Sequence, residues 1–82
     1  MNVLYTRQAD RDYDDLPPVL QARVDKQLDL LLADLRHPSI RAKKYDESRD
    51  IWQGRVNRSY RFYFKIDGDN YVILSKIGRA HV

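Results

Sequence analysis

Three β-rich runs joined by short turns constrain the fold of this chain more than any other feature of its sequence. The runs are Ile51 to Asn57, Tyr60 to Ile66 and Tyr71 to Ile77, separated by Arg58-Ser59 and by Asp67-Gly68-Asp69-Asn70. Turns this short join antiparallel neighbours, because a parallel pair needs a long crossover connection. We therefore expect the second half of the chain to form an antiparallel sheet.

The first half of the chain has helical patterns. Val3 to Thr6 predicts a short first strand, and Arg7 to Asp15 predicts a short helix that ends before Leu16-Pro17-Pro18. Proline is tolerated in the first turn of a helix, so a second helix should begin near this break. Its apolar residues recur at steps of three and four, which is the spacing of one helical face: Leu20, Val24, Leu28, Leu31 and Leu35.

The second helix should run to about Arg36, because Pro38 disfavours a further helical turn. A role in the hydrophobic core is the favoured interpretation of its leucines. Pro38 to Asp50 is polar and lacks apolar periodicity, which predicts an exposed connection. The predicted fold class is α+β, with two N-terminal helices packed on an antiparallel sheet of three to four strands.

Length and composition limit the class of protein further. The chain has 82 residues, enough for one hydrophobic core, so we expect a single domain over residues 1–82. The longest apolar run, Leu30 to Ala33, is too short to cross a membrane, and no secretion signal is visible, so a cytoplasmic location is expected. There is no cysteine and there are two histidines, so we expect no metal site and no cofactor.

The net charge of +3 is unevenly distributed along the chain. Residues 1–35 carry four Lys/Arg against seven Asp/Glu, whereas residues 36–82 carry eleven against five. The second half is therefore the part expected to meet a polyanion. The alternative is that these cations only keep a small protein in solution.

Side-chain alternation along the strands places part of this charge on one face of the sheet. Tyr60, Phe62, Phe64 and Ile66 should share the core face, and Arg61, Tyr63 and Lys65 should share the other. A hairpin would bring Arg55 onto the same outer face as Arg61. The planar guanidinium group of arginine can donate hydrogen bonds to two phosphate oxygens, and a tyrosine ring can stack on a base. This face therefore suits single-stranded RNA. A plain solvated face is the alternative, because antiparallel sheets commonly leave one polar face in water.

The run from Ile51 to Ile66 resembles the central signature of the RelE/ParE toxin superfamily. It has an aromatic residue and an arginine, a short turn, an aromatic-Arg pair and a hydrophobic strand. The predicted order of elements is also similar, over about Val3 to Ser75. The resemblance implies the toxin of a type II toxin–antitoxin system, with a cognate antitoxin protein as partner and a possible hetero-oligomer with it.

Within this superfamily, the Trp52 to Arg61 spacing is similar to that of the YoeB branch, which implies mRNA cleavage in the ribosomal A site. The resemblance assigns Arg61 to the scissile phosphate and Arg55 to a supporting role. The chemistry implied is attack by a ribose 2′-hydroxyl on the adjacent phosphorus without a metal. An upstream glutamate of that branch aligns with Ala42, which leaves Glu47 as candidate base, and His81 is the candidate acid. The expected RNA-binding residues are Lys43, Lys44, Arg58, Tyr63 and Lys65.

Two alternatives stay open from the sequence. One is a ParE-like toxin that inhibits DNA gyrase, and the other is a catalytically inactive member that only binds its antitoxin. The segment from Ile77 to Val82 also matches the translation of a common sequencing adapter, so residues 77–82 are expected to be a non-native tail.

Overall fold

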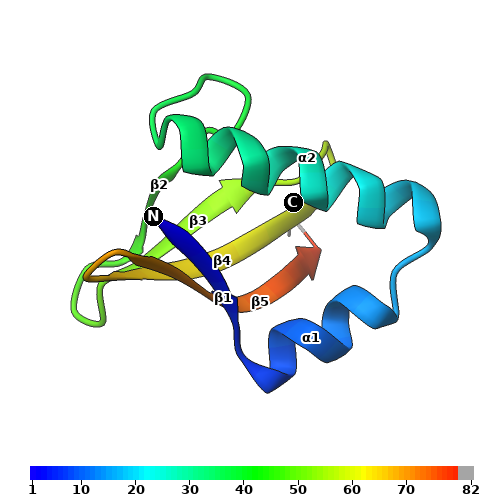
Figure 1. The fold of residues 1–82 in the computed structure, drawn as a ribbon, viewed down its shortest axis with the longest axis horizontal. Helices are drawn as coiled ribbons and strands as arrows, with labels where there is room; N and C mark the ends of the chain where they lie inside the picture. The colour runs from blue at the N-terminus through cyan, green and yellow to red at the C-terminus, as the bar shows by residue number, and fades with distance from the viewer. Residues whose placement is uncertain (80–82) are drawn as a thin grey trace.

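The computed structural model describes residues 1–79, with side chains described for residues 1–75. Two helices and five strands follow one another as β1 (Asn2–Tyr5), α1 (Arg7–Asp14), α2 (Pro18–Ala33), β2 (Lys43–Asp46), β3 (Ile51–Arg55), β4 (Tyr60–Asp67) and β5 (Asn70–Arg79). The strands form one sheet in the order β1-β5-β4-β3-β2 (Figure 1). Only the β1–β5 pair is parallel among the described strand pairs. The predicted α+β class with two N-terminal helices is confirmed.

Local chemistry explains where the helices begin and end. The Thr6 hydroxyl accepts a hydrogen bond from the Ala9 amide at 3.2 Å, which caps α1. The α2 helix begins with proline, which has no amide hydrogen. The amides of the first helical turn have no partner within the helix, so proline loses no helical hydrogen bond there. The α2 helix ends at Ala33, three residues before the predicted end. The reason is that Asp34 is extended and its carboxylate accepts a hydrogen bond from the Arg36 amide at 2.9 Å, an alternative to a further helical turn.

The sheet has five strands within the described residues, so the prediction of three to four was one strand short. The missing strand, β2, lies inside the segment 38–50 that was predicted to be a connection. It pairs with β3 through Lys43 opposite Gln53 and Lys44 opposite Trp52. Edge strands are often rich in charged residues, and β2 is one of them. It therefore lacks the apolar alternation from which a strand can be predicted.

Both helices pack on one face of the sheet and build a single core. Ala9 of α1 and Val24, Leu28 and Leu31 of α2 join the inward side chains of the sheet, among which Phe62, Phe64 and Ile73 are fully buried. Figure 1 shows α2 running across the sheet, with α1 beside β5. Ile66 was predicted to lie in the core but is 41% exposed, because β4 extends beyond the part of the sheet that the helices cover. Neither described helix is long and apolar enough to cross a membrane.

Candidate nucleic-acid interface

Two arginines lie directly opposite each other on the face of the sheet that points away from the helices. In the β3–β4 pairing Arg55 is opposite Arg61, and Gly54 is opposite the buried Phe62. Side chains alternate across strands, so Arg55 and Arg61 share the outer face, as predicted. Neither described helix packs on this face. Among the described side chains, no carboxylate forms an ion pair with either arginine.

Further arginines reach this pair from outside the hairpin. The Arg55 amide donates to the Ile40 carbonyl at 2.6 Å, which brings the loop that carries Arg41 against the end of β3. The Arg23 Nε donates to the Val56 carbonyl at 2.8 Å. Burial, followed by the charges of the surrounding arginines, lowers the pKa of Arg55; the contributing residues are Arg41, Arg61, Arg23 and Arg58. We call these five side chains the arginine cluster.

Sequence reasoning missed Arg23 and Arg41, because they come from α2 and from a loop rather than from the signature strands. A signal for Arg23 existed in its spacing from Gln27. The two residues are four apart and so share one side of α2. Gln27 is fully buried, and its Nε2 donates to the Arg55 carbonyl at 2.8 Å and to the Ser39 carbonyl at 3.1 Å. This side of α2 therefore holds the backbone that carries the arginine cluster.

Aromatic rings continue the outer face toward β2. The Tyr45 and Tyr63 rings lie 4.9 Å apart between centroids and are tilted by 58°. Burial and the neighbouring Tyr45 raise the pKa of Tyr63, and Arg61 opposes this shift, so the phenol stays neutral at physiological pH. Tyr45 is 60% exposed, which leaves its ring accessible to a planar ligand. A strand face with adjacent arginines and an open ring has the groups that bind phosphates and stack on unpaired bases.

The remaining predicted RNA-binding lysines divide between the two faces of the sheet. Lys43 is opposite Gln53, and Lys65 follows Tyr63 by two residues, so both belong to the outer face. Lys44 instead lies beside Trp52, with its Nζ 5.1 Å from the ring centroid and 2.5 Å from Asp50 Oδ1. Lys44 is therefore paired on the helix-bearing face, away from the arginine cluster.

Comparison with known proteins identifies the family. The model of the ParE toxin of the type II toxin–antitoxin system parDE matches residues 3–81. The chain belongs to the ParE toxin family. It is thus the toxin of a type II toxin–antitoxin system, and the resemblance to the RelE/ParE superfamily is confirmed. No curated protein sequence matches the toxin significantly.

Solved structures of related toxins share the fold of this toxin. The archaeal RelE–RelB complex from Pyrococcus horikoshii OT3 is 17% identical, with a TM-score of 0.79, over 99% of this chain and 97% of that one. The YoeB–YefM complex from Staphylococcus aureus is 16% identical, with a TM-score of 0.77, over 100% and 98%. The toxin–antitoxin complex RelBE2 from Mycobacterium tuberculosis is 26% identical, with a TM-score of 0.74, over 95% and 96%. All three are complexes of a toxin with its antitoxin.

Of the two predicted proton-transfer residues, the structure describes Glu47, which lies away from the arginine cluster of the toxin. Glu47 is exposed in the turn between β2 and β3, next to Asp46, which is opposite Ile51. Arg55 lies four residues farther along β3, roughly 13 Å away at the usual rise of a strand. His81 lies outside the described residues, which end at residue 79 within the expected tail. The roles of Glu47 and His81 therefore stay predictions.

Proposed function

We propose that the toxin is a ribosome-dependent endonuclease that cleaves mRNA in the A site. The observation that carries this proposal is the direct pairing of Arg55 and Arg61 on the open face of the sheet. Like charges directly opposite each other in a sheet are unfavourable for folding, so a function that needs them is the natural explanation. A phosphodiester would relieve this repulsion, because its charge lies between the two guanidinium groups.

The cluster would act by binding the charge that develops during cleavage. The 2′-hydroxyl attacks the adjacent phosphorus, the bond to the 5′-oxygen of the next nucleotide breaks, and a cyclic phosphate and a free 5′-hydroxyl result. Negative charge builds on the phosphate oxygens, where arginines already held in place stabilise it without reorganisation. The Arg61 Nη1 donates to the carbonyls of Asn57 and Tyr60 at 3.0 and 3.2 Å, which keeps this side chain in position before RNA binds.

Base recognition would use the two tyrosines next to the cluster. The Tyr45 and Tyr63 rings can stack on the unpaired bases of a codon, as aromatic residues do in single-stranded RNA sites. Glu47 and His81 are the candidates for proton transfer. Because mRNA on the ribosome is the substrate, the cytoplasm is the proposed location, and a cognate antitoxin would hold the toxin inactive there.

The test is mRNA integrity on translating ribosomes after induction of the toxin. We expect cleavage by the unmodified toxin, loss of cleavage in Arg61→Ala and in Arg55→Ala, and normal cleavage in Arg11→Ala. Arg11 is an exposed arginine of α1 and serves as a control for the loss of one positive charge. Intact mRNA from the unmodified toxin, under conditions that arrest growth, would contradict the proposal.

A second candidate function is inhibition of DNA gyrase. The observation that favours it is the family model, which describes the ParE toxin of parDE. It predicts growth arrest with DNA breaks and intact mRNA, whereas an inactive member would bind the antitoxin without arresting growth. Measuring chromosome integrity in the same cultures distinguishes these three outcomes.

A further inference from the structure

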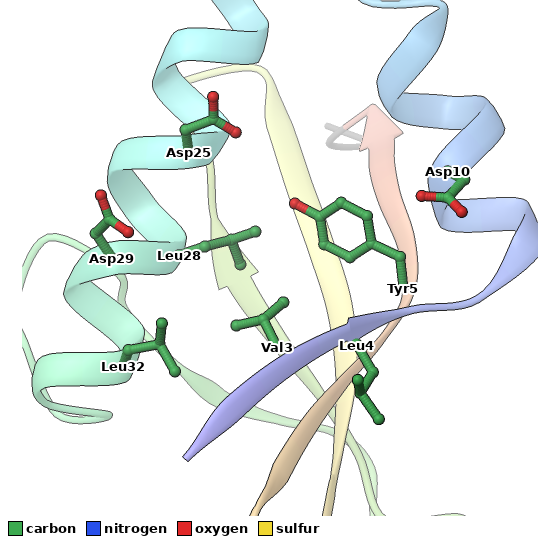
Figure 2. Close-up of a pocket in the computed structure, with 8 residues that line it drawn as sticks. All are labelled: Val3, Leu4, Tyr5, Asp10, Asp25, Leu28, Asp29 and Leu32. Atoms are coloured by element: carbon green, nitrogen blue, oxygen red, sulfur yellow. The ribbon is translucent and has the colours of Figure 1, made fainter.

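The helix-bearing side of the toxin has two hollows of opposite charge. Figure 2 shows the first, a groove between β1 and the helices that is lined by Asp10, Asp25 and Asp29 as well as by apolar side chains. No basic side chain is among its described lining residues, so this groove repels a polyanion. The second hollow lies beyond the C-terminal end of α2 and has the charge that attracts one.

This second hollow is a pocket of about 300 Å³, which we call the basic pocket. The residues that line it include three that carry or can carry positive charge and three that offer apolar surface: Arg36, His37, Arg41, Leu35, Ala42 and Trp52. No carboxylate is among its described lining residues. A cavity of this size is at the lower end of the range for small-molecule sites. The basic pocket therefore suits one anionic ligand with an apolar part, of about the size of a nucleotide.

Trp52 is the aromatic wall of the basic pocket. Its ring lies 6.2 Å from the Phe64 ring between centroids, and the two ring planes differ by 19°. Phe64 is fully buried, so this contact holds the Trp52 ring in place before a ligand binds. The Lys44 Nζ lies 5.1 Å from the Trp52 centroid and adds a positive charge beside the pocket. A fixed aromatic ring among cations provides the apolar contact that a base needs and the charge that a phosphate needs.

Hydrogen-bond donors are available around this wall. Arg36 and Arg41 are exposed, and among the described side chains no carboxylate forms an ion pair with either. The His37 Nδ1 accepts a hydrogen bond from the Ser39 amide at 3.1 Å. Nδ1 therefore carries no proton, and the proton of the neutral imidazole is on Nε2, which can donate to an anion. The pocket thus offers two guanidinium groups and an imidazole to a phosphate.

Arg41 joins the basic pocket to the arginine cluster. It lines the pocket, and its charge also acts on Arg55. Continuing the register in which Lys43 is opposite Gln53 places Arg41 opposite Arg55, at the edge of the described sheet. The backbone of Arg41 has a φ of 50°, a left-handed conformation that a Cβ makes unfavourable. An arginine at a position where the backbone favours glycine indicates that its side chain is needed there.

We propose that the basic pocket binds one nucleotide of a single-stranded RNA, next to the nucleotides at the arginine cluster. The base contacts Trp52, and the phosphate that links this nucleotide to its neighbour lies at Arg41. A single strand can reach both places by passing around β2, because β2 is the edge of the described sheet. That the nucleotide belongs to an RNA rests on the proposed function, whereas the chemistry of the pocket does not. The pocket then fixes the register of the RNA, since the nucleotide bound there determines which phosphate lies at Arg55 and Arg61.

The test uses NMR spectra of the isotopically labelled, full-length toxin. Trp52 is the single tryptophan, so its indole N–H gives one resonance that reports on the basic pocket. The probe is AMP, compared with ribose 5-phosphate, which has the charge without the base. We expect AMP to shift the indole resonance in a saturable way and ribose 5-phosphate to bind roughly tenfold more weakly, because it lacks the contact of the base with the ring. An indole resonance that AMP leaves unmoved, or equal affinity for the two compounds, would overturn the inference.

A charge variant and a longer probe complete the test. Arg36→Ala should lower the affinity for AMP roughly fivefold, because an exposed charge pair is lost, whereas the control Arg11→Ala on α1 should bind like the unmodified toxin. A four-nucleotide, 2′-O-methylated RNA should shift the indole resonance together with the Arg55 and Arg61 amides and bind more tightly than AMP, because its linked nucleotides occupy both places. Equal affinities of the two variants for AMP, or an RNA that shifts only one of the two regions, would contradict the inference. Intact mRNA in the cleavage assay would instead refute the proposed function and leave AMP binding unaffected.

Discussion

Replacement of Gly54 by alanine should destabilise the toxin through a single steric contact. Gly54 is opposite Phe62 in the β3–β4 pair and immediately precedes Arg55. A Cβ at this position would lie 2.4 and 2.5 Å from two ring atoms of Phe62 and 3.1 Å from a methyl carbon of Ile40. Ordinary van der Waals contact begins at 3.4 Å, so the ring would have to retreat by roughly 1 Å. It has little room to do so, because Phe62 is fully buried and stacks on Phe64 at 5.5 Å.

The expected loss follows from the cost of overpacking a core. Extra methyl groups in a filled core typically cost about 1–3 kcal/mol. Alanine restricts the unfolded chain more than glycine, which returns about 0.4–1 kcal/mol of stability. The net loss of unfolding free energy should therefore be about 1–2 kcal/mol. In a domain of this size that loss lowers Tm by roughly 5–15 °C.

The assay is thermal and urea unfolding followed by circular dichroism, with a double-mutant cycle. Phe62→Leu should relieve the contact, so Gly54→Ala should cost less in the Phe62→Leu background, with a coupling of about 1–2 kcal/mol. Gly68→Ala is the control. Gly68 has a φ of 57° and nothing within 4 Å of its added Cβ, so its cost comes from the backbone and Phe62→Leu should not relieve it. A Gly54→Ala variant with unchanged Tm, or strictly additive losses, would refute the steric argument.

Three other predictions concern the interface and the core. In Arg55→Gln, the magnitude of the slope of log affinity for single-stranded RNA against log salt concentration should fall by about 0.7, because one phosphate contact is lost. An unchanged slope in a salt titration would mean that Arg55 contacts no phosphate. Gln27→Leu should lower the unfolding free energy by about 1–3 kcal/mol, because the carbonyls of Ser39 and Arg55 lose a buried hydrogen-bond donor. Urea unfolding measures this loss, and equal stability of the two proteins would show that these hydrogen bonds contribute nothing. Tyr5 has its pKa raised in the fold, so the stability it contributes is complete below pH 10 and is lost as the pH rises toward about 12. Tyr5→Phe should therefore flatten alkaline unfolding over this window, and an ultraviolet absorbance titration should show one phenol ionising near pH 12.

Much of the architecture was predictable because apolar periodicity is a local signal. The spacing of Val24, Leu28 and Leu31 required one helical face to be buried, and all three are buried against the sheet. The same reasoning did not find β2 (Lys43–Asp46), a strand at the edge of the sheet in which three of the four side chains are charged. A strand held mainly by backbone hydrogen bonds leaves little trace in a hydrophobic pattern.

The candidate site was predictable only in part for a related reason. Alternation along the strands was sufficient to place Arg55 and Arg61 on one face, because a hairpin with a short turn fixes which residues are neighbours. Arg23 and Arg41 reach the same place through hydrogen bonds of the Arg23 side chain and the Arg55 amide to distant carbonyls. Contacts of this kind depend on how α2 and the 37–41 loop pack on the sheet.

The sequence by itself determined the secondary structure of the two helices and the signature hairpin, the core face of β4 and the excess of positive charge in the second half. These properties follow from the order of neighbouring residues, which the chain carries before it folds. Only the tertiary structure decided that five arginines gather at one end of β3, that Lys44 pairs with Asp50 on the other face, and that Asp10, Asp25 and Asp29 surround an apolar groove. The physical reason is that electrostatic fields and grooves depend on distances between residues far apart in the chain, and packing of the helices on the sheet sets those distances.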